Sequence, residues 1–308
     1  MQIDTLNPES YIEQGGLGRH ETFTPRYGWL KKGYEAVKKD GNIFKAKDAI
    51  ERLGVGKNMV NSIRFWCQAF NLIEFDDNKQ MVPTEFGKRL LDDDGWDPYL
   101  EDMASLWLLH WQLFIPKIEA INWPLAFNKF NLWSFNIQSL SKILIDAAQK
   151  FSRHNSTSSK SFERDSSCII RMYAKDIPEK ELEIDCPFTQ LGIIIKGEED
   201  NLFSFNTSEK QDLPPLIFAA TCFSFIDNYA SYGQKTISLQ RLTYDFNSPG
   251  VIFKLPESVV GSYLEKARKL VGSFSLVDYL GNIQLHLNGD PLDIYWQTLE
   301  TYYKGEAK

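Results

Sequence analysis

Apolar residues recur every three or four positions in three stretches of the N-terminal third of the chain. This spacing predicts helices over residues 25–41, 45–54 and 57–70. The stretch "NIF" between the first two helices has an extended pattern, and two glycines before the third predict a tight turn. Two short apolar runs on either side of Asp76–Lys79 predict a β-hairpin. Helix, short strand, helix, turn, helix and hairpin, in this order, are typical of a winged-helix domain.

The rest of the chain is also largely helical in pattern. A strongly apolar helix is predicted from about Pro98, a hairpin over residues 188–205 and a buried helix over residues 214–230. Near the C-terminus the N-terminal order returns in a weaker form, as two helices and a hairpin in residues 236–246, 256–270 and 274–289. This repetition predicts a second winged-helix-like unit.

These patterns together predict a mainly α fold with small β-hairpins. We expect an N-terminal winged helix-turn-helix domain over residues 1–95, a helical middle region over 96–180, and an α+β C-terminal domain over 181–308. The length of 308 residues is compatible with more than one domain.

The composition indicates a cytoplasmic protein. No apolar run approaches the roughly 18 residues that cross a bilayer, and the N-terminus "MQIDTLNPES" has no secretory signal pattern. The four cysteines are far apart and form no Cys-x-x-Cys pair, which favours free thiols in a reducing compartment. The net charge is −7, yet residues 19–90 hold 14 basic and 9 acidic side chains. A basic N-terminal segment on an acidic body is compatible with local attraction to phosphate.

The stretch "GVGK" at residues 54–57 resembles the end of a phosphate-binding loop. A complete loop needs a further glycine five positions before Gly56 and a hydroxyl residue after Lys57. Glu51 and Asn58 occupy those positions, and a helical segment precedes the loop where a strand is required. The two glycines are therefore interpreted as the turn before the third helix, and a nucleotide site is not predicted.

The third predicted helix carries two different faces. One apolar stripe, facing the core, holds Val60, Ile63, Cys67 and Phe70. The opposite stripe holds Lys57, Asn61, Arg64, Phe65 and Gln68. Asn, Arg and Gln can pair with base edges in the major groove, and Lys57 at the helix start can hold a phosphate. Phe65 is expected either to pack on a neighbouring element or to touch a thymine methyl group. The alternative is that this stripe is the solvated side of a module for protein contacts.

Further basic residues are predicted to support that helix on the DNA backbone. They are Arg19, Arg26, Lys31 and Lys79. Glu21 is expected to orient one of its basic neighbours, with the alternative that residues 19–26 are only a packed lead-in to the first helix.

No catalytic, metal or cofactor site is predicted. His20-Glu21 lacks the second histidine of a zinc-protease helix, because Thr24 stands at that position. Asp97 and Glu101 are one helical turn apart, a spacing that suits a hard cation, but Asp97 is better interpreted as a helix N-cap. Enzyme activity is thus not supported by any residue set.

Four segments together resemble a known family, the bacterial domain-of-unknown-function family 4007. These segments are "RHETFTPRYGWLKKG", "LGVGKNMVNSIRFWCQAFNLIE", "PTEFGKRLL" and "DPYLEDMASLWLLHWQL", and "CPFTQLGII" extends the likeness over roughly residues 17–300. The resemblance implies a role in bacterial DNA sulfur modification (phosphorothioation) and antiphage defence, beside a phosphosulfate-reductase-like sulfur-transfer protein or other DNA-modification proteins. It implies no catalytic residue.

The sequence therefore predicts a DNA-binding accessory or regulatory protein of such a system, with double-stranded DNA as partner and no membrane contact. Two alternatives stay open. One is an adaptor that docks a sulfurtransferase or ATPase partner, and the other is an uncharacterised nuclease.

Overall fold

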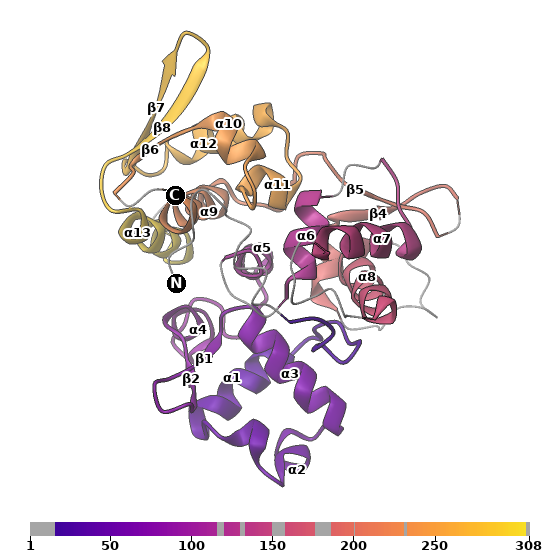
Figure 1. The fold of residues 1–308 in the computed structure, drawn as a ribbon. Helices are drawn as coiled ribbons and strands as arrows, with labels where there is room; N and C mark the ends of the chain where they lie inside the picture. The colour runs from indigo at the N-terminus through magenta and orange to yellow at the C-terminus, as the bar shows by residue number, and fades with distance from the viewer. Residues whose placement is uncertain are drawn as a thin grey trace. The chain divides into compact units, whose positions relative to one another are not determined.

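The structure of the chain is a computed structural model that describes residues 16–115, 120–129, 133–149, 158–175, 186–199, 201–230 and 233–305 (Figure 1). It is mainly helical with small sheets and forms two compact units. Of the described residues, the N-terminal unit takes 16–113 and 120–205, and the C-terminal unit takes 114–115 and 206–305. The three-part division predicted from the sequence stays a prediction. The predicted lack of a secretory signal concerns residues that lie outside the described ones.

The three helices predicted in the N-terminal third are present, as α1 (Trp29–Lys39), α2 (Ala49–Leu53) and α3 (Lys57–Ala69). Gly54 ends α2 in the left-handed region, with φ 64°, which explains the glycine in the turn. The strand expected at "NIF" was wrong. Residues Ile43–Lys45 form a 3₁₀ helix (η2), because their N–H groups bond to carbonyls three residues earlier, at Asp40 and Asn42.

The hairpin after α3 is confirmed. Strands β1 (Ile73–Phe75) and β2 (Met81–Pro83) are antiparallel, and Lys79 occupies their turn with a positive φ of 60°. Helix α4 (Glu85–Leu91) follows and is capped by Thr84, whose side chain accepts a hydrogen bond from the Gly87 N–H.

Helix α5 (Met103–Gln112) is buried along almost its whole length, as predicted, but it begins later than Pro98. Asp102 is its N-cap and accepts from the Ala104 N–H at 2.9 Å. The assignment of the N-cap to Asp97 was therefore wrong. The Asp97 carboxylate instead accepts from the N–H groups of Glu101 and Asp102, at 2.9 and 3.0 Å, and so closes the loop before the helix.

The N-terminal unit continues with three helices and a small sheet. The helices are α6 (Asn122–Lys129), α7 (Ile137–Ala148) and α8 (Ser159–Tyr173). In the sheet, β4 (Ile194–Lys196) and β5 (Phe203–Phe205) form the predicted hairpin, and β3 (Ala174–Lys175) adds a parallel strand. A 3₁₀ helix, η4 (Pro187–Leu191), precedes β4.

One aromatic core joins these parts of the N-terminal unit. Trp66 of α3 lies with its ring centroid 5.4 Å from Trp123 of α6 and 5.5 Å from Phe70. Phe70 stacks in turn on Phe188 of η4 at 4.9 Å. Each of these side chains is buried, so α3 packs both against the helices of its own N-terminal segment and against later ones.

The C-terminal unit is built on α9 (Pro215–Tyr229) and α13 (Pro291–Tyr303), which pack on each other. Along the chain, the elements between these two helices are β6 (Thr236–Ser238), α10 (Leu239–Tyr244), α11 (Pro249–Phe253), α12 (Glu257–Ala267), β7 (Phe274–Tyr279) and β8 (Asn282–Leu287). The predicted C-terminal hairpin is β7–β8. The helix predicted over 236–246 was wrong at its start, because Thr236–Ser238 pair with β8 and give the sheet order β6-β8-β7.

Candidate nucleic-acid interface

Helix α3 buries more of its circumference than the sequence pattern predicts. The core stripe from Val60 to Phe70 is buried, as expected. Phe65 is also buried, at 4% exposure, and its ring packs 4.9 Å from Trp66 and 5.9 Å from His20. Of the two roles left open for Phe65, packing on a neighbouring element is the one observed. The polar stripe is thereby reduced to a narrow edge.

That edge holds the four residues predicted to contact DNA. Lys57 is exposed at the first turn, and Asn61, Arg64 and Gln68 follow along α3 in half-buried positions. Lys57, Arg64 and Gln68 make no side-chain hydrogen bond or ion pair with any residue that the structure describes. Their polar ends are therefore available to a ligand.

A short segment lies against this edge of α3. Residues 18–24, which we call the strap, run between α3 and α8. The indole N–H of Trp66 in α3 donates to the Phe23 carbonyl at 3.0 Å, and Arg171 of α8 donates to the Thr22 carbonyl at 2.5 Å. The backbone of Glu21 and Thr22 is left-handed, with φ of 52° and 67°. Such backbone strain persists only where surrounding contacts hold it, and here both neighbouring helices supply them.

A buried ion pair between His20 and Asp165 fixes the strap to α8. His20 Nε2 lies 2.8 Å from Asp165 Oδ1 of α8, and the other carboxylate oxygen accepts from Asn122 at 2.6 Å and from the Gly18 N–H at 3.3 Å. Burial lowers the pKa of His20, but neighbouring Cys168 and the hydrogen bond to Asp165 raise it, with a net value of about 10. The raised pKa favours the imidazolium form of His20, and Nε2–H donates to Asp165.

Glu21 has a different partner from the one predicted. The sequence suggested that it orients a neighbouring basic residue, whereas its Oε1 accepts a hydrogen bond from the Asn61 amide at 3.2 Å. Asn61 is thus held in one orientation by the strap. A base edge or phosphate that approaches Asn61 would also meet the Glu21 carboxylate.

The supporting basic residues are spread over the N-terminal unit. Arg19 is exposed in the strap, and Lys79 is exposed in the β1–β2 turn. The Arg26 guanidinium lies over the rings of Phe23 and Trp29, 5.5 and 5.2 Å from their centroids. Lys31 lies in an ion pair with Glu35 at 3.1 Å. None of these contacts joins Arg26 or Lys31 to the α3 edge.

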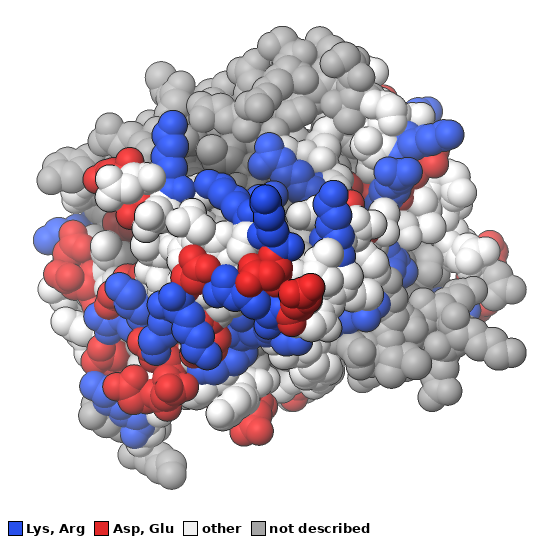
Figure 2. Space-filling model, turned by 90° about the horizontal axis from the view of Figure 1, so that it is seen from below, with Lys and Arg blue, Asp and Glu red and all other residues white. Residues whose placement is uncertain are grey.

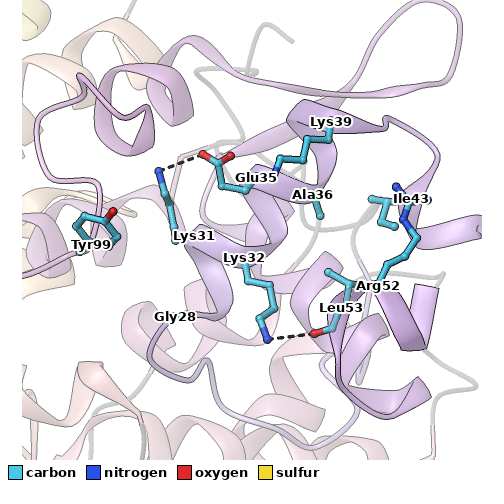
Figure 3. A pocket seen from close by; sticks show the side chains of 10 residues that line it. All are labelled: Gly28, Lys31, Lys32, Glu35, Ala36, Lys39, Ile43, Arg52, Leu53 and Tyr99. Atoms are coloured by element: carbon cyan, nitrogen blue, oxygen red, sulfur yellow. Dashed lines mark hydrogen bonds and ion pairs between the residues drawn. The ribbon is translucent and has the colours of Figure 1, made fainter. Parts of the chain in front are cut away.

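Several basic residues, including Lys31, line a cavity of about 520 Å³ between α1 and α2 (Figure 3). Its lining consists of Gly28, Lys31, Lys32, Glu35, Ala36, Lys39, Ile43, Arg52, Leu53 and Tyr99. Figure 3 shows Lys31 turned to Glu35 and Lys32 turned to the Leu53 carbonyl, a contact of 3.0 Å. Arg52 is also paired, with Asp40 at 2.8 Å. An anion in this cavity would have to compete with these partners.

The charges on the protein surface are also mixed in sign. Figure 2 shows many Lys and Arg side chains on the face seen from below, with Asp and Glu among them. In the N-terminal unit, Lys31, Lys38 and Arg52 each form an ion pair with an acidic side chain. Electrostatic attraction to nucleic acid is therefore expected from individual free cations and not from one uniform field.

Sequence reasoning missed Asp165, Asn122 and Arg171 as partners of the strap. These residues follow His20 and Thr22 by a hundred positions or more, and no local motif connects them. Among the described residues, no group of three or more His, Cys, Asp or Glu side chains is placed to hold a metal ion. In the same part of the chain, no helix has the length and apolarity that crossing a membrane requires.

Comparison with known proteins gives one family and two similar structures. The profile of the family described as "Protein of unknown function (DUF4007)" matches residues 17–303. A crystal structure of a protein called SspB is 32% identical, with a TM-score of 0.88, and the match covers 96% of this chain and 90% of that one. A magnesium-ion-bound crystal structure of SspB is 31% identical, with the same TM-score and coverage. No curated protein matches this chain.

Proposed function

Because the chain belongs to the DUF4007 family, we propose that it is a DNA-binding accessory or regulatory protein of a bacterial DNA phosphorothioation and antiphage defence system. The α3 edge, made of Lys57, Asn61, Arg64 and Gln68, is the part that binds duplex DNA. The observation that carries the proposal is this edge itself, where Lys57, Arg64 and Gln68 have no partner among the described residues and Asn61 is pre-oriented by Glu21.

The order of elements supports this assignment. Helices α1, α2 and α3 followed by the β1–β2 hairpin have the order of a winged-helix domain, in which the third helix enters the major groove. In that arrangement Lys57 lies at the N-terminus of α3, where free N–H groups favour a phosphate. We propose that Lys79, in the β1–β2 turn, contacts the DNA backbone beside the groove.

The C-terminal unit supports a second winged-helix-like element. Strand β6, helices α10, α11 and α12 and the β7–β8 hairpin follow one another, and β6 pairs with β8 as the third strand. This order resembles the N-terminal one with an additional strand. Two such elements in one chain suit a protein that contacts an extended duplex.

The link to sulfur modification rests on family resemblance. The partner implied by it is a phosphosulfate-reductase-like sulfur-transfer protein or another DNA-modification protein. The magnesium ion of the similar SspB structure belongs to that protein, and we assign no metal role here.

DNA binding is tested by the affinity of the full chain for a labelled duplex over a salt series, for wild type, Arg64→Ala and Arg89→Ala. Wild type should show a steep decrease in affinity with salt, because phosphate contacts release counterions. Arg64→Ala should lose roughly 1–3 kcal/mol if Arg64 pairs with a base. Arg89, a half-buried arginine of α4 that is ion-paired with Glu85, is the matched control and should bind as wild type does.

Binding that is absent or insensitive to salt in the intact protein would contradict the proposal. A second comparison, of plain and phosphorothioated duplexes of one sequence, tests the sulfur link. Equal affinity for the two duplexes would contradict recognition of phosphorothioate and would leave the proposal of DNA binding standing.

A second candidate function is an adaptor for a protein partner. The turn of the β7–β8 hairpin carries Tyr279 and Leu280 in exposed positions, and Leu280 is fully exposed. Isolated exposed aromatic and aliphatic side chains of this kind occur at protein interfaces. The substitution Leu280→Ser should then weaken binding of the sulfur-transfer partner and leave duplex affinity unchanged, as measured with both purified proteins.

A further inference from the structure

Helix α8 presents a basic stripe that the sequence did not single out. Lys160, Arg164, Ser167 and Arg171 lie at positions i, i+4, i+7 and i+11, so they share one side of the helix. Lys160 and Arg164 are exposed, and Ser167 and Arg171 are half-buried. With a rise of 1.5 Å per residue, the stripe is about 16 Å long.

Two adjoining hollows follow this stripe, with volumes of about 450 and 340 Å³. Ser167 and Arg171 line both hollows, which therefore adjoin along α8. We call the two hollows together the α8 groove. One hollow is lined further by Asn136, Ile137, Gln138, Ile170, Asn201 and Phe203. The other is lined further by Thr22, Lys160, Glu163 and Arg164.

The charges in the α8 groove are predominantly positive. Glu163 is the one acid among the lining residues, against three basic side chains. Lys160 and Arg164 make no ion pair with the residues that the structure describes. The other acid of this part of α8, Asp165, points inward and is occupied by His20 and Asn122. This differs from the cavity between α1 and α2, where Lys31 and Arg52 are paired with carboxylates.

The α8 groove lies beside the α3 edge within the same unit. Arg171 donates to the carbonyl of Thr22, and the preceding strap residue, Glu21, accepts from Asn61 of α3. The two surfaces therefore lie on either side of one short segment, and the buried pair of His20 and Asp165 fixes that segment to α8. A ligand long enough to cross the strap can touch both.

We propose that the α8 groove binds the phosphate backbone of the same DNA that the α3 edge contacts. This inference rests on the proposed function and adds a second site to it. Lys160 and Arg164 supply the charge, and the side chains of Ser167, Asn136 and Gln138 supply neutral donors of the kind that commonly contact phosphate oxygens. Consecutive phosphates of one DNA strand are close enough together for a stripe of about 16 Å to contact more than one of them.

The test compares wild type, the double variant Lys160→Glu/Arg164→Glu and the neutral double variant Lys160→Gln/Arg164→Gln for affinity to a labelled duplex over a salt series. Lys88→Glu is the matched control, because Lys88 is an exposed lysine of α4 in the same unit and lines none of these hollows. Circular dichroism checks that each variant is folded. The substituted side chains are exposed, so loss of the fold is not expected, and the neutral variant avoids introducing repulsion.

We expect the charge-reversed variant to bind at least ten-fold more weakly at low salt. Both double variants should show a salt dependence shallower by about two ions, because each lost phosphate contact lowers the slope by about one. Lys88→Glu should retain the wild-type slope. If wild type binds and Arg64→Ala is weakened while both double variants keep the wild-type affinity and slope, the α8 groove is not a DNA site and the proposed function stands. If wild type does not bind duplex DNA at all, both are overturned.

Discussion

His20 is a histidine whose position is decided by residues far along the chain. It lies at 1% exposure between the rings of Phe65 and Trp123, and its charge is balanced by Asp165 at 2.8 Å. A buried pair of this kind is weak evidence for net stability, but removal of one partner leaves the other charge without compensation. His20 therefore matters more for holding the strap in one place than for adding free energy of folding.

At this scale we predict a pH effect on the free energy of unfolding. The pKa of His20 is raised in the folded chain from 6.5 to about 10, so its stabilisation is complete below pH 6.5 and is lost as the pH rises through about 10. The difference in the free energy of unfolding between wild type and His20→Gln should therefore become smaller as the pH rises across that window. Urea unfolding at several pH values measures it, and a difference that stays constant with pH would contradict the expectation.

Helices α1 and α3 approach closely because Gly33 has no side chain. A Cβ at this position would lie 2.5 Å from Cys67 Sγ and 2.7 Å from Ile63 Cγ2, both in α3. These distances are shorter than van der Waals contact, and the neighbouring side chains are fully buried. The packing of the first helix against the proposed DNA-contacting helix therefore depends on one glycine in the middle of α1.

At the scale of the element we predict that Gly33→Ala destabilises the protein by about 1–3 kcal/mol, because overpacking outweighs the better helix propensity of alanine. The matched control is Gly261→Ala in α12, where the nearest atom to an added Cβ is Leu239 Cδ2 at 3.4 Å. That variant should be neutral or slightly more stable. Thermal unfolding of the three proteins gives the comparison, and equal destabilisation by both substitutions would refute it.

At the scale of the whole molecule, the two units are not continuous in sequence. Phe114 belongs to the C-terminal unit although its neighbours on the N-terminal side belong to the other. Its carbonyl accepts hydrogen bonds from the Tyr229 hydroxyl at 2.6 Å and from the Asn247 amide at 3.0 Å, and all three residues are buried. The Asn247 amide also bonds to the Tyr229 hydroxyl at 2.8 Å, which closes a network among the three.

We therefore expect Asn247→Ala to destabilise the C-terminal unit by about 1–3 kcal/mol, because it leaves buried polar groups with fewer partners. Asn288→Ala provides the comparison, since Asn288 also donates to a carbonyl, that of Gly272, but in an exposed position. The Asn288→Ala substitution should lower the free energy of unfolding by about 0.5 kcal/mol. Denaturant unfolding followed by circular dichroism distinguishes the two, and equal losses would show that burial of the network does not matter.

Local patterns determined the elements of this protein. Helical spacing was sufficient to locate α1, α3 and α9, and turn residues were sufficient to locate the β1–β2 and β7–β8 hairpins. These signals are short in range, because a helix or hairpin places its apolar side chains at fixed intervals along the chain. The errors occurred where short segments lack that periodicity, as at Ile43–Lys45 and Thr236–Ser238, whose conformation depends on a neighbouring turn or strand.

The sequence by itself thus determined a mainly helical protein whose third helix has one apolar and one polar side. The tertiary structure decided how much of that polar side is left to a ligand. Phe65 is buried, Glu21 holds Asn61 in one orientation, and the bond between His20 and Asp165 fixes the strap to α8. Contacts between residues 40 to 149 positions apart leave no periodic trace in a single sequence, so only the folded chain shows the α3 edge and the α8 groove on either side of one strap.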